Sequence, residues 1–180
     1  MKNGSIPHTI EARALAARQV TLEGCLAAAK LPRLAAAVRA LEAPAEVVAE
    51  FKRDEEGRYV VDLQAAIVVE VACERCLDAM PLAISSSARL GIVWTDEQAQ
   101  ALPSGVEPLL TGDETDLWQV VEDELLLALP AFSYHSDSRC GEATGVAQPD
   151  PVRPDETDTP VRDNPFTVLA ALKNEPSERS

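Results

Sequence analysis

The chain has 180 residues, enough for one domain with a hydrophobic core and too few for a multidomain enzyme with a separate cofactor-binding fold. Its 30 Asp and Glu residues exceed its 16 Lys and Arg residues, and the formal net charge of -14 opposes attraction to phosphate backbones and anionic membranes. Aromatic residues make up 4% of the chain, which argues against a conventional aromatic-stacking platform for single-stranded nucleic acid. Any nucleic-acid contact must therefore be local.

Targeting signals and membrane spans are not expected. The longest apolar run, residues 125–131, is far shorter than a bilayer span, and residues 1–13 lack a long apolar segment. We therefore predict a cytoplasmic protein with no membrane partner. Four cysteines are too few for a disulfide scaffold. In a reducing compartment we expect them to bind metal or to be buried as free thiols rather than to form disulfides.

The first half of the chain predicts a sheet. Residues 18–23 alternate polar and apolar types as a strand does, and apolar residues at helical spacing predict a helix over 31–41. Residues 46–53 and 59–63, joined by a turn at 54–57 that contains Gly57, read as a hairpin.

Two further strands are predicted over 65–72 and 82–94, separated by a cysteine pair and Pro81. The simplest topology is an antiparallel meander. A helix over 116–129 follows, with Asp116 as its N-cap and Pro130 as its stop. The fold class expected for 1–140 is therefore α+β, a largely antiparallel sheet packed by a few helices.

The C-terminal part has a different composition. Residues 141–163 are rich in Pro and acids and poor in apolar residues, so we predict a disordered linker. Residues 164–173 then form a short amphipathic helix that docks on the domain, with an Asn cap and Pro at the first helical position. A disordered tail is expected over 174–180.

Cys73 and Cys76 form a CxxC pair, the most specific local feature of the chain. Two thiols at this spacing converge on one metal ion when the backbone turns between them. Because zinc takes four ligands, His135 and Cys140 in the loop after the last predicted helix are the candidates for completing a Cys3His site. Three readings stay open: a zinc site, inert buried thiols, and thiol–disulfide exchange. No other cofactor is expected.

Charged residues outside this cluster give less specific predictions of function. Glu122, Asp123 and Glu124 lie on the outer face of the helix over 116–129 and are read as an acidic, solvent-facing surface rather than a catalytic site. The candidate RNA contacts are basic residues, mostly on the early helix: Lys30, Arg33, Arg39 and Arg75. Trp94 and Trp118 are expected to belong to the core. The chain lacks the serine-elbow and phosphate-loop patterns of common enzymes, so no catalytic residue and no small-molecule substrate are predicted.

Taken in order, the CxxC pair, the acidic run near Asp96, the motif 122–130, the His135 and Cys140 loop and the motif 164–173 resemble the YceD family of large ribosomal RNA subunit accumulation proteins. The residues that match the family pattern are Cys73, Cys76, Glu122, Asp123, Glu124, Pro130, His135, Cys140, Asn164, Pro165 and Phe166. The resemblance implies a cytoplasmic, non-enzymatic factor needed for normal levels of large-subunit (23S) ribosomal RNA, with plastid relatives tied to the same process.

The acidic composition and the resemblance together predict a ribosome-biogenesis factor that binds a basic ribosomal or ribosome-assembly protein, and that contacts large-subunit ribosomal RNA through its basic front. The partner-binding residues expected are Glu122, Asp123, Glu124, Asn164, Pro165 and Phe166. The alternative is an enzyme, either a thiol redox protein that uses the CxxC pair or an RNA-processing enzyme that uses the carboxylate helix.

Overall fold

A computed structural model describes residues 4–141 of the chain. Its centre is a sheet with strand order β2-β4-β5-β6-β7, in which neighbours are antiparallel except for the parallel pair β6 and β7. The strands are β2 (Thr21–Leu26), β4 (Ala45–Arg53), β5 (Tyr59–Ala72), β6 (Ala79–Val93) and β7 (Glu107–Leu110). A short strand, β3 (Ala40–Leu41), also pairs with β5. The predicted α+β class and the meander are confirmed.

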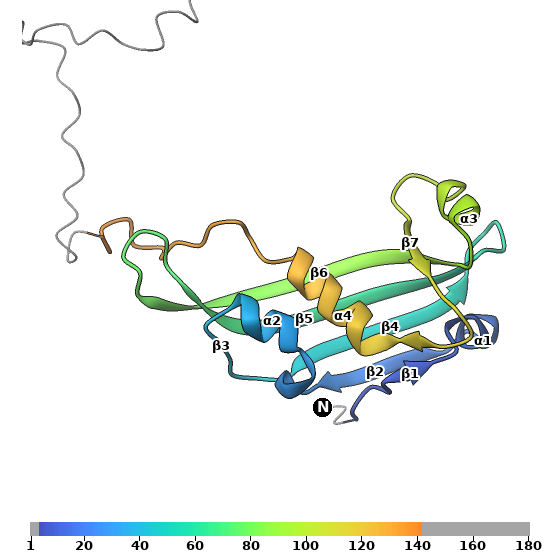
Figure 1. Ribbon diagram of the computed structural model, residues 1–180, viewed down its shortest axis with the longest axis horizontal. Helices are drawn as coiled ribbons and strands as arrows, with labels where there is room; N and C mark the ends of the chain where they lie inside the picture. The colour runs from blue at the N-terminus through green and yellow to red at the C-terminus, as the bar shows by residue number, and fades with distance from the viewer. Residues whose placement is uncertain (1–3, 142–180) are drawn as a thin grey trace, which may run out of the picture. The chain divides into compact units, whose positions relative to one another are not determined.

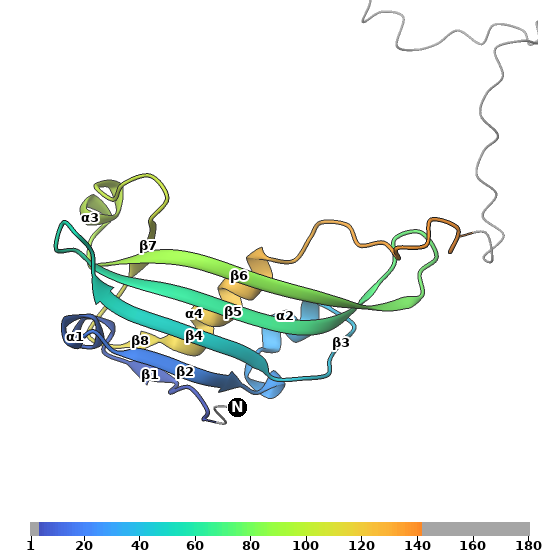
Figure 2. The same ribbon diagram turned by 180° about the vertical axis from the view of Figure 1, so that it is seen from behind.

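Three helices, α1 (Ala12–Arg18), α2 (Pro32–Ala37) and α4 (Leu117–Leu127), pack on one face of this sheet, and most of the other face is uncovered in the two opposite views (Figure 1, Figure 2). The short α3 (Asp96–Gln100) lies beside the end of β6, and Leu102 after it packs near Gly91 on the second face. A 3-10 turn, η1 (Ala28–Lys30), precedes α2. In the described part of the chain no helix is long and apolar enough to cross a membrane.

Strand periodicity decides which side chains form the core. Along β4 every second residue from Ala45 to Phe51 is buried and the residues between them face the open side, because successive side chains point to opposite faces. On β5 the series from Val61 to Val69 does the same. Val121 and Leu125 of α4, both fully buried, pack against this layer.

Three predicted boundaries are wrong. Residues 59–63 and 65–72, predicted as two strands, form the single strand β5, which pairs with β6 along almost its whole length. Arg18 ends α1 instead of beginning a strand, and the first strand runs over Thr21–Leu26. The helix predicted over 31–41 ends at Ala37, because Val38 takes an extended conformation and the backbone N–H of Arg39 donates to Glu70 of β5 at 2.8 Å. Pairing with the sheet therefore outweighs helical propensity at this point.

Other predictions hold. Gly57 adopts a positive φ of 80° in the hairpin turn between β4 and β5. Asp116 caps α4, since its side chain accepts the backbone N–H of Gln119 at 3.0 Å. The predicted docking helix over 164–173 and the tail lie outside the described residues, as does the linker beyond Gly141.

A two-stranded ribbon ties the N-terminus to the start of α4. Strand β1 (Thr9–Ile10) pairs with β8 (Thr115–Asp116). The Nε2–H of His8 donates to the Asp116 carboxylate at 3.0 Å, and the His8 ring stacks on Trp118. The N-terminal segment therefore fixes the direction in which α4 crosses the sheet.

Candidate metal centre

The CxxC pair lies in the turn between β5 and β6. The backbone turns at residues 74–76, Leu77 takes a left-handed φ of 65°, and its N–H donates to the carbonyl of Cys73 at 2.8 Å. A straight strand would point the two thiols in different directions, whereas this turn places both on the inside. The predicted turn is confirmed.

A second segment meets this turn from the other half of the chain. The residues that follow α4 run back along the sheet to the β5–β6 turn (Figure 1). There the backbone N–H of Glu74 donates to the carbonyl of Ser133 at 2.9 Å, and the backbone N–H of His135 points to the Cys73 sulfur at 3.5 Å. These contacts hold the two segments in register.

Four ligand-type side chains converge at this junction: Cys73, Cys76, His135 and Cys140. Their ligand atoms all lie within 4.8 Å of one another. The Cys76 sulfur is 3.3 Å from His135 Nδ1, and the sulfurs of Cys73 and Cys140 are 3.8 Å apart. Cys73 and Cys76 are buried, and the other two are half-buried. The structure thus brings together the four residues that the sequence proposed; we name them the Cys3His cluster.

The electrostatics of the cluster favour one thiolate in the absence of a cation. Burial works to raise the pKa of Cys73, but backbone N–H donors from His135, Cys76 and Arg75 outweigh it and lower the pKa to about 6. Burial, together with the neighbouring sulfurs of Cys73 and Cys140, raises the pKa of Cys76 to about 11. Ionisation of a second thiol in this cluster would therefore need a positive charge nearby.

Arg75 organises the loop that carries Cys140. Its guanidinium donates to the carbonyl of Asp137 at 2.9 Å, approaches the Cys140 sulfur at 3.5 Å, and lies over the ring of Tyr134. This position holds the loop close to the turn. The side chain thus has partners within the protein, and its predicted contact with RNA stays a prediction.

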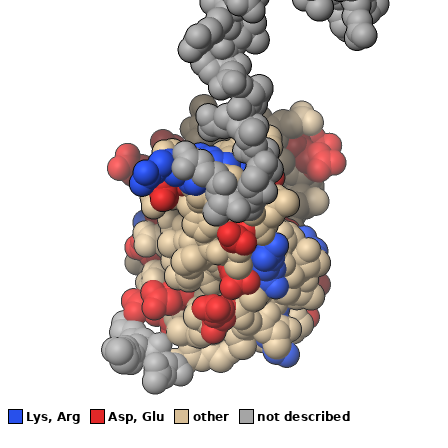
Figure 3. Space-filling view, turned by 90° about the vertical axis from the view of Figure 1, so that its left-hand side faces the viewer, with Lys and Arg blue, Asp and Glu red and all other residues tan. Residues whose placement is uncertain are grey.

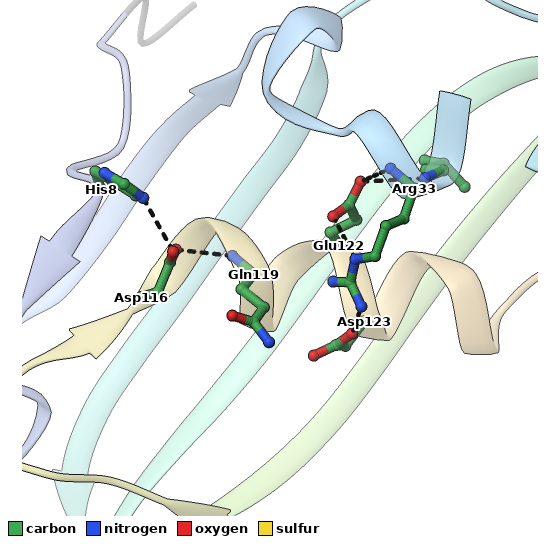
Figure 4. A network of polar contacts seen from close by, with 7 residues as sticks. His8, Arg33, Asp116, Gln119, Glu122 and Asp123 are labelled. Carbon is green, nitrogen blue, oxygen red and sulfur yellow. Dashed lines mark hydrogen bonds and ion pairs between the residues drawn. The ribbon is translucent and has the colours of Figure 1, made fainter. Parts of the chain in front are cut away.

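The expected acidic surface on α4 is wrong for two of its three residues. Glu122 and Glu124 are buried, with 4% and 8% of their surfaces exposed. Glu122 accepts the backbone N–H groups of Arg33 and Leu34 at the start of α2, and also the Arg33 guanidinium at 2.9 Å (Figure 4). Consecutive residues on a helix point in different directions, and here two of them point toward neighbouring elements.

The other two carboxylates have partners as well. Glu124 accepts the Ser86 hydroxyl of β6 at 2.8 Å. Asp123, the half-exposed member, pairs with Arg33 at 2.6 Å. Seen from the end that carries the β5–β6 turn, acidic and basic side chains are interspersed, and no continuous acidic face is visible (Figure 3). Partner binding by these three residues stays a prediction.

The remaining predicted RNA contacts are engaged as well. Arg33 is held by the carboxylates of α4, Arg39 donates to the carbonyl of Leu77 at 3.0 Å, and Lys30 lies over the ring of Trp118. Contact of these residues with RNA stays a prediction. Residues 164–166 lie outside the described residues.

Sequence comparison identifies related proteins. The family model described as "Large ribosomal RNA subunit accumulation protein YceD" matches residues 61–173. The large ribosomal RNA subunit accumulation protein YceD of Haemophilus influenzae is 33% identical over 175 residues, which cover 96% of this chain and 99% of that relative. No solved structure matches the chain.

Proposed function

Because this chain belongs to the YceD family, we propose that it supports the accumulation and maturation of large-subunit (23S) ribosomal RNA as a binding factor and not as an enzyme. The observation that carries this proposal is the alignment of almost the whole chain with the large ribosomal RNA subunit accumulation protein of Haemophilus influenzae. A role in ribosome assembly also implies residence in the cytoplasm.

A strain that lacks the gene tests this role. We expect the ratio of large-subunit to small-subunit ribosomal RNA to fall, and the wild-type chain supplied in trans to restore it. An unchanged ratio across growth temperatures would contradict the proposed function.

We further propose that the Cys3His cluster binds one zinc ion. Three thiolates and one imidazole are ligands that zinc accepts, and the proximity of their ligand atoms fits a tetrahedral site. The ion would also supply the positive charge that allows all three thiols to ionise. Four protein ligands leave no open position for a reactive water, which makes the role structural rather than catalytic.

Metal analysis of the purified full-length chain tests the zinc proposal. We expect about one zinc ion per wild-type chain and per Cys25→Ser variant, because Cys25 lies in β2, away from the cluster. The Cys76→Ser variant should retain far less zinc. Bound zinc should also be released as the pH falls, since the thiols regain their protons. A metal-free wild-type chain from zinc-replete cells would contradict this proposal.

Thiol–disulfide exchange is the second candidate function, favoured by the 3.8 Å between the sulfurs of Cys73 and Cys140. In this reaction a thiolate of the pair attacks a disulfide of a partner, and the second thiol resolves the mixed disulfide, so the partner is reduced. Titration with oxidised and reduced glutathione separates the candidates. A reversible internal disulfide in the chain as purified supports exchange, whereas zinc-protected thiols support the structural site.

The proposed protein partner is a basic ribosomal or ribosome-assembly protein. Residues 54–180 contain 8 Lys and Arg against 25 Asp and Glu. This excess of negative charge attracts basic proteins, and added salt screens the attraction. We expect copurification of basic proteins at low ionic strength and their loss as salt rises. Copurification that resists salt, or that yields acidic proteins, would contradict this partner class.

A further inference from the structure

A pocket lies at the end of the sheet opposite the Cys3His cluster. It has a volume of about 280 Å³, and its lining includes Arg13, Arg58, Tyr59, Trp94, Gln98 and Leu102. The lining residues come from α1, the turn between β4 and β5, the end of β6 and α3. These elements all lie at the same end of the sheet in both ribbon views (Figure 1, Figure 2). Its volume is just below that of typical sites for drug-sized ligands, so it can hold one small group.

Aromatic rings and guanidinium groups alternate at this pocket. The Arg13 guanidinium carbon lies 4.4 Å from the Trp94 ring centre and 4.8 Å from the Tyr59 ring centre. Arg53, beside the pocket and not part of its lining, lies over the Tyr59 ring at 4.5 Å. Planar groups stack readily on such an arrangement, because an aromatic ring and a guanidinium both offer a flat face.

Trp94 is exposed, contrary to the expectation from sequence. With 53% of its surface accessible, it contributes little to the core despite its size. The backbone N–H of Trp94 donates to the side-chain oxygen of Gln98 at 2.8 Å, which fixes Gln98 beside the ring. The amide nitrogen of Gln98 carries two further N–H donors suited to the edge of a base.

The positive charge at the pocket comes from a few arginines, and acidic residues lie close by. Among residues 4–141 no carboxylate forms an ion pair with Arg13 or Arg53, whereas Arg58 is paired with Asp54 and Glu56. Asp96 and Glu97 of α3 follow Trp94 closely in the chain. The pocket thus attracts one or two phosphate groups, and the surrounding carboxylates would repel the phosphates of a longer backbone segment.

We propose that this pocket binds one nucleotide of single-stranded RNA, with its base stacked at Trp94 and its flanking phosphates near Arg13 and Arg53. The choice of RNA rests on the proposed function in ribosomal RNA accumulation. Base stacking needs an accessible ring and tolerates any base, and both cations can contact the backbone. One such pocket is compatible with an aromatic content too low for an extended platform.

Binding of a fluorescently labelled, unstructured hexaribonucleotide to the full-length chain tests the proposal. We expect Trp94→Leu to weaken binding about tenfold, the size of one lost stacking contact. Arg13→Gln and Arg53→Gln should weaken it less and reduce its salt dependence. The matched control is Arg18→Gln, an exposed cation on the same helix as Arg13 that does not line the pocket, which should change binding less than twofold.

Intrinsic fluorescence gives an independent reading. In the Trp118→Phe background Trp94 is the remaining tryptophan, and the hexamer should quench it. Circular dichroism and unfolding midpoints confirm that each variant folds. The inference is overturned if Trp94→Leu binds RNA as tightly as wild type, if uridine monophosphate binds as tightly as the hexamer, or if only an acidic peptide binds.

The two proposals fail in distinguishable ways. If loss of the gene leaves ribosomal RNA levels unchanged while the hexamer binds at Trp94, the proposed function fails and the pocket stands. If loss of the gene lowers large-subunit RNA while the wild-type chain does not bind the hexamer, the pocket inference fails alone.

Discussion

Glu122 is the residue whose role differs most from what its type suggests. The sequence predicts that its carboxylate faces solvent. In the structure the carboxylate accepts two backbone N–H groups and one guanidinium, and so links α4 to the start of α2. Sequence could not reveal this, because the partners lie about ninety residues away in the chain and only the packing of α2 on α4 brings them together.

Replacing Glu122 by Ala should therefore destabilise the fold. Two backbone donors, one of them on buried Leu34, would lose their acceptor, and we expect a loss of about 2 kcal/mol in the free energy of unfolding. Asp123→Asn, which removes one exposed ion pair, should cost less than about 0.5 kcal/mol. Urea unfolding measures both, and equal effects would contradict this assignment.

Asp62 predicts a dependence of stability on pH. Hydrogen bonding to Arg89, and also to Lys52, lowers the pKa of Asp62 to about 2, against the opposing effect of partial burial. Because the folded-state pKa lies below the unfolded one, the ion pairs stabilise the fold above pH ~4 and lose this effect as the pH falls toward 2.

The change is on the order of 1 to 2 kcal/mol once solvent screening is allowed for. Asp62→Asn should lack this contribution, so its free energy of unfolding should fall less steeply between about pH 5 and pH 2 than that of the wild type. Parallel curves for the two proteins in urea unfolding would show that Asp62 contributes nothing through this linkage.

At the scale of elements, sequence patterns predicted the features that depend on neighbouring residues, namely strands, turns and helix caps. Alternation identified strand structure within β4, β5 and β6, although β5 was predicted as two strands; Gly57 marked the hairpin turn, and Asp116 marked the start of α4. What sequence missed depends on distant pairing: β3 ends the α2 region early, and β7 joins the sheet parallel to β6. The helix α1, rich in alanine, gave no strong periodic signal.

The candidate site shows the same division. The CxxC turn is local and was predictable, and His135 and Cys140 were reachable by counting ligands that zinc requires. The pocket at Trp94 was not predictable, because Arg13, Tyr59 and Trp94 come from three separate elements with no shared motif. Their contacts arise from the sheet and from α1 lying at its end.

Gly24 of β2 is required by a close approach of the N-terminal segment. A Cβ atom at this position would overlap the backbone carbonyl oxygen of Gly4, which accepts the N–H of Cys25 at 2.8 Å. Gly24→Ala should therefore destabilise the fold by about 1 to 3 kcal/mol, since backbone must shift.

Gly112→Ala is the matched control, because no atom lies within 4 Å of its added Cβ. It should leave the thermal midpoint nearly unchanged. A midpoint for Gly24→Ala equal to that of Gly112→Ala would show that the N-terminal segment does not pack on β2 as described.

At the scale of the whole described domain, the long β5–β6 hairpin separates two regions of different chemistry. The Cys3His cluster joins the turn of this hairpin to the segment after α4, whereas Trp94 and its pocket follow the opposite end of β6. In Figure 2 the β5–β6 turn and α3, which contributes to the pocket, lie at opposite ends of the sheet. A bound zinc ion would therefore act as a clamp on the last described residues, far from the proposed RNA contact.

Removal of the metal should have a local effect that follows this arrangement. Hydrogen exchange of backbone amides near Glu74 and His135 should accelerate after chelation, because the ion holds the two segments together. Amides in the centre of β5, buried in the sheet, should change little. Uniform acceleration across the sheet would instead indicate that the metal controls global stability.

The most direct measurement is the ratio of large-subunit to small-subunit ribosomal RNA in cells that lack the gene and carry one variant of it, with protein levels matched. The account predicts that the wild type and Cys25→Ser restore the ratio, while Cys76→Ser, which loses a ligand of the cluster, restores it only in part. Full restoration by Cys76→Ser would contradict a role for the metal centre. A normal ratio in cells without any copy would contradict the central claim that this chain supports accumulation of large-subunit ribosomal RNA.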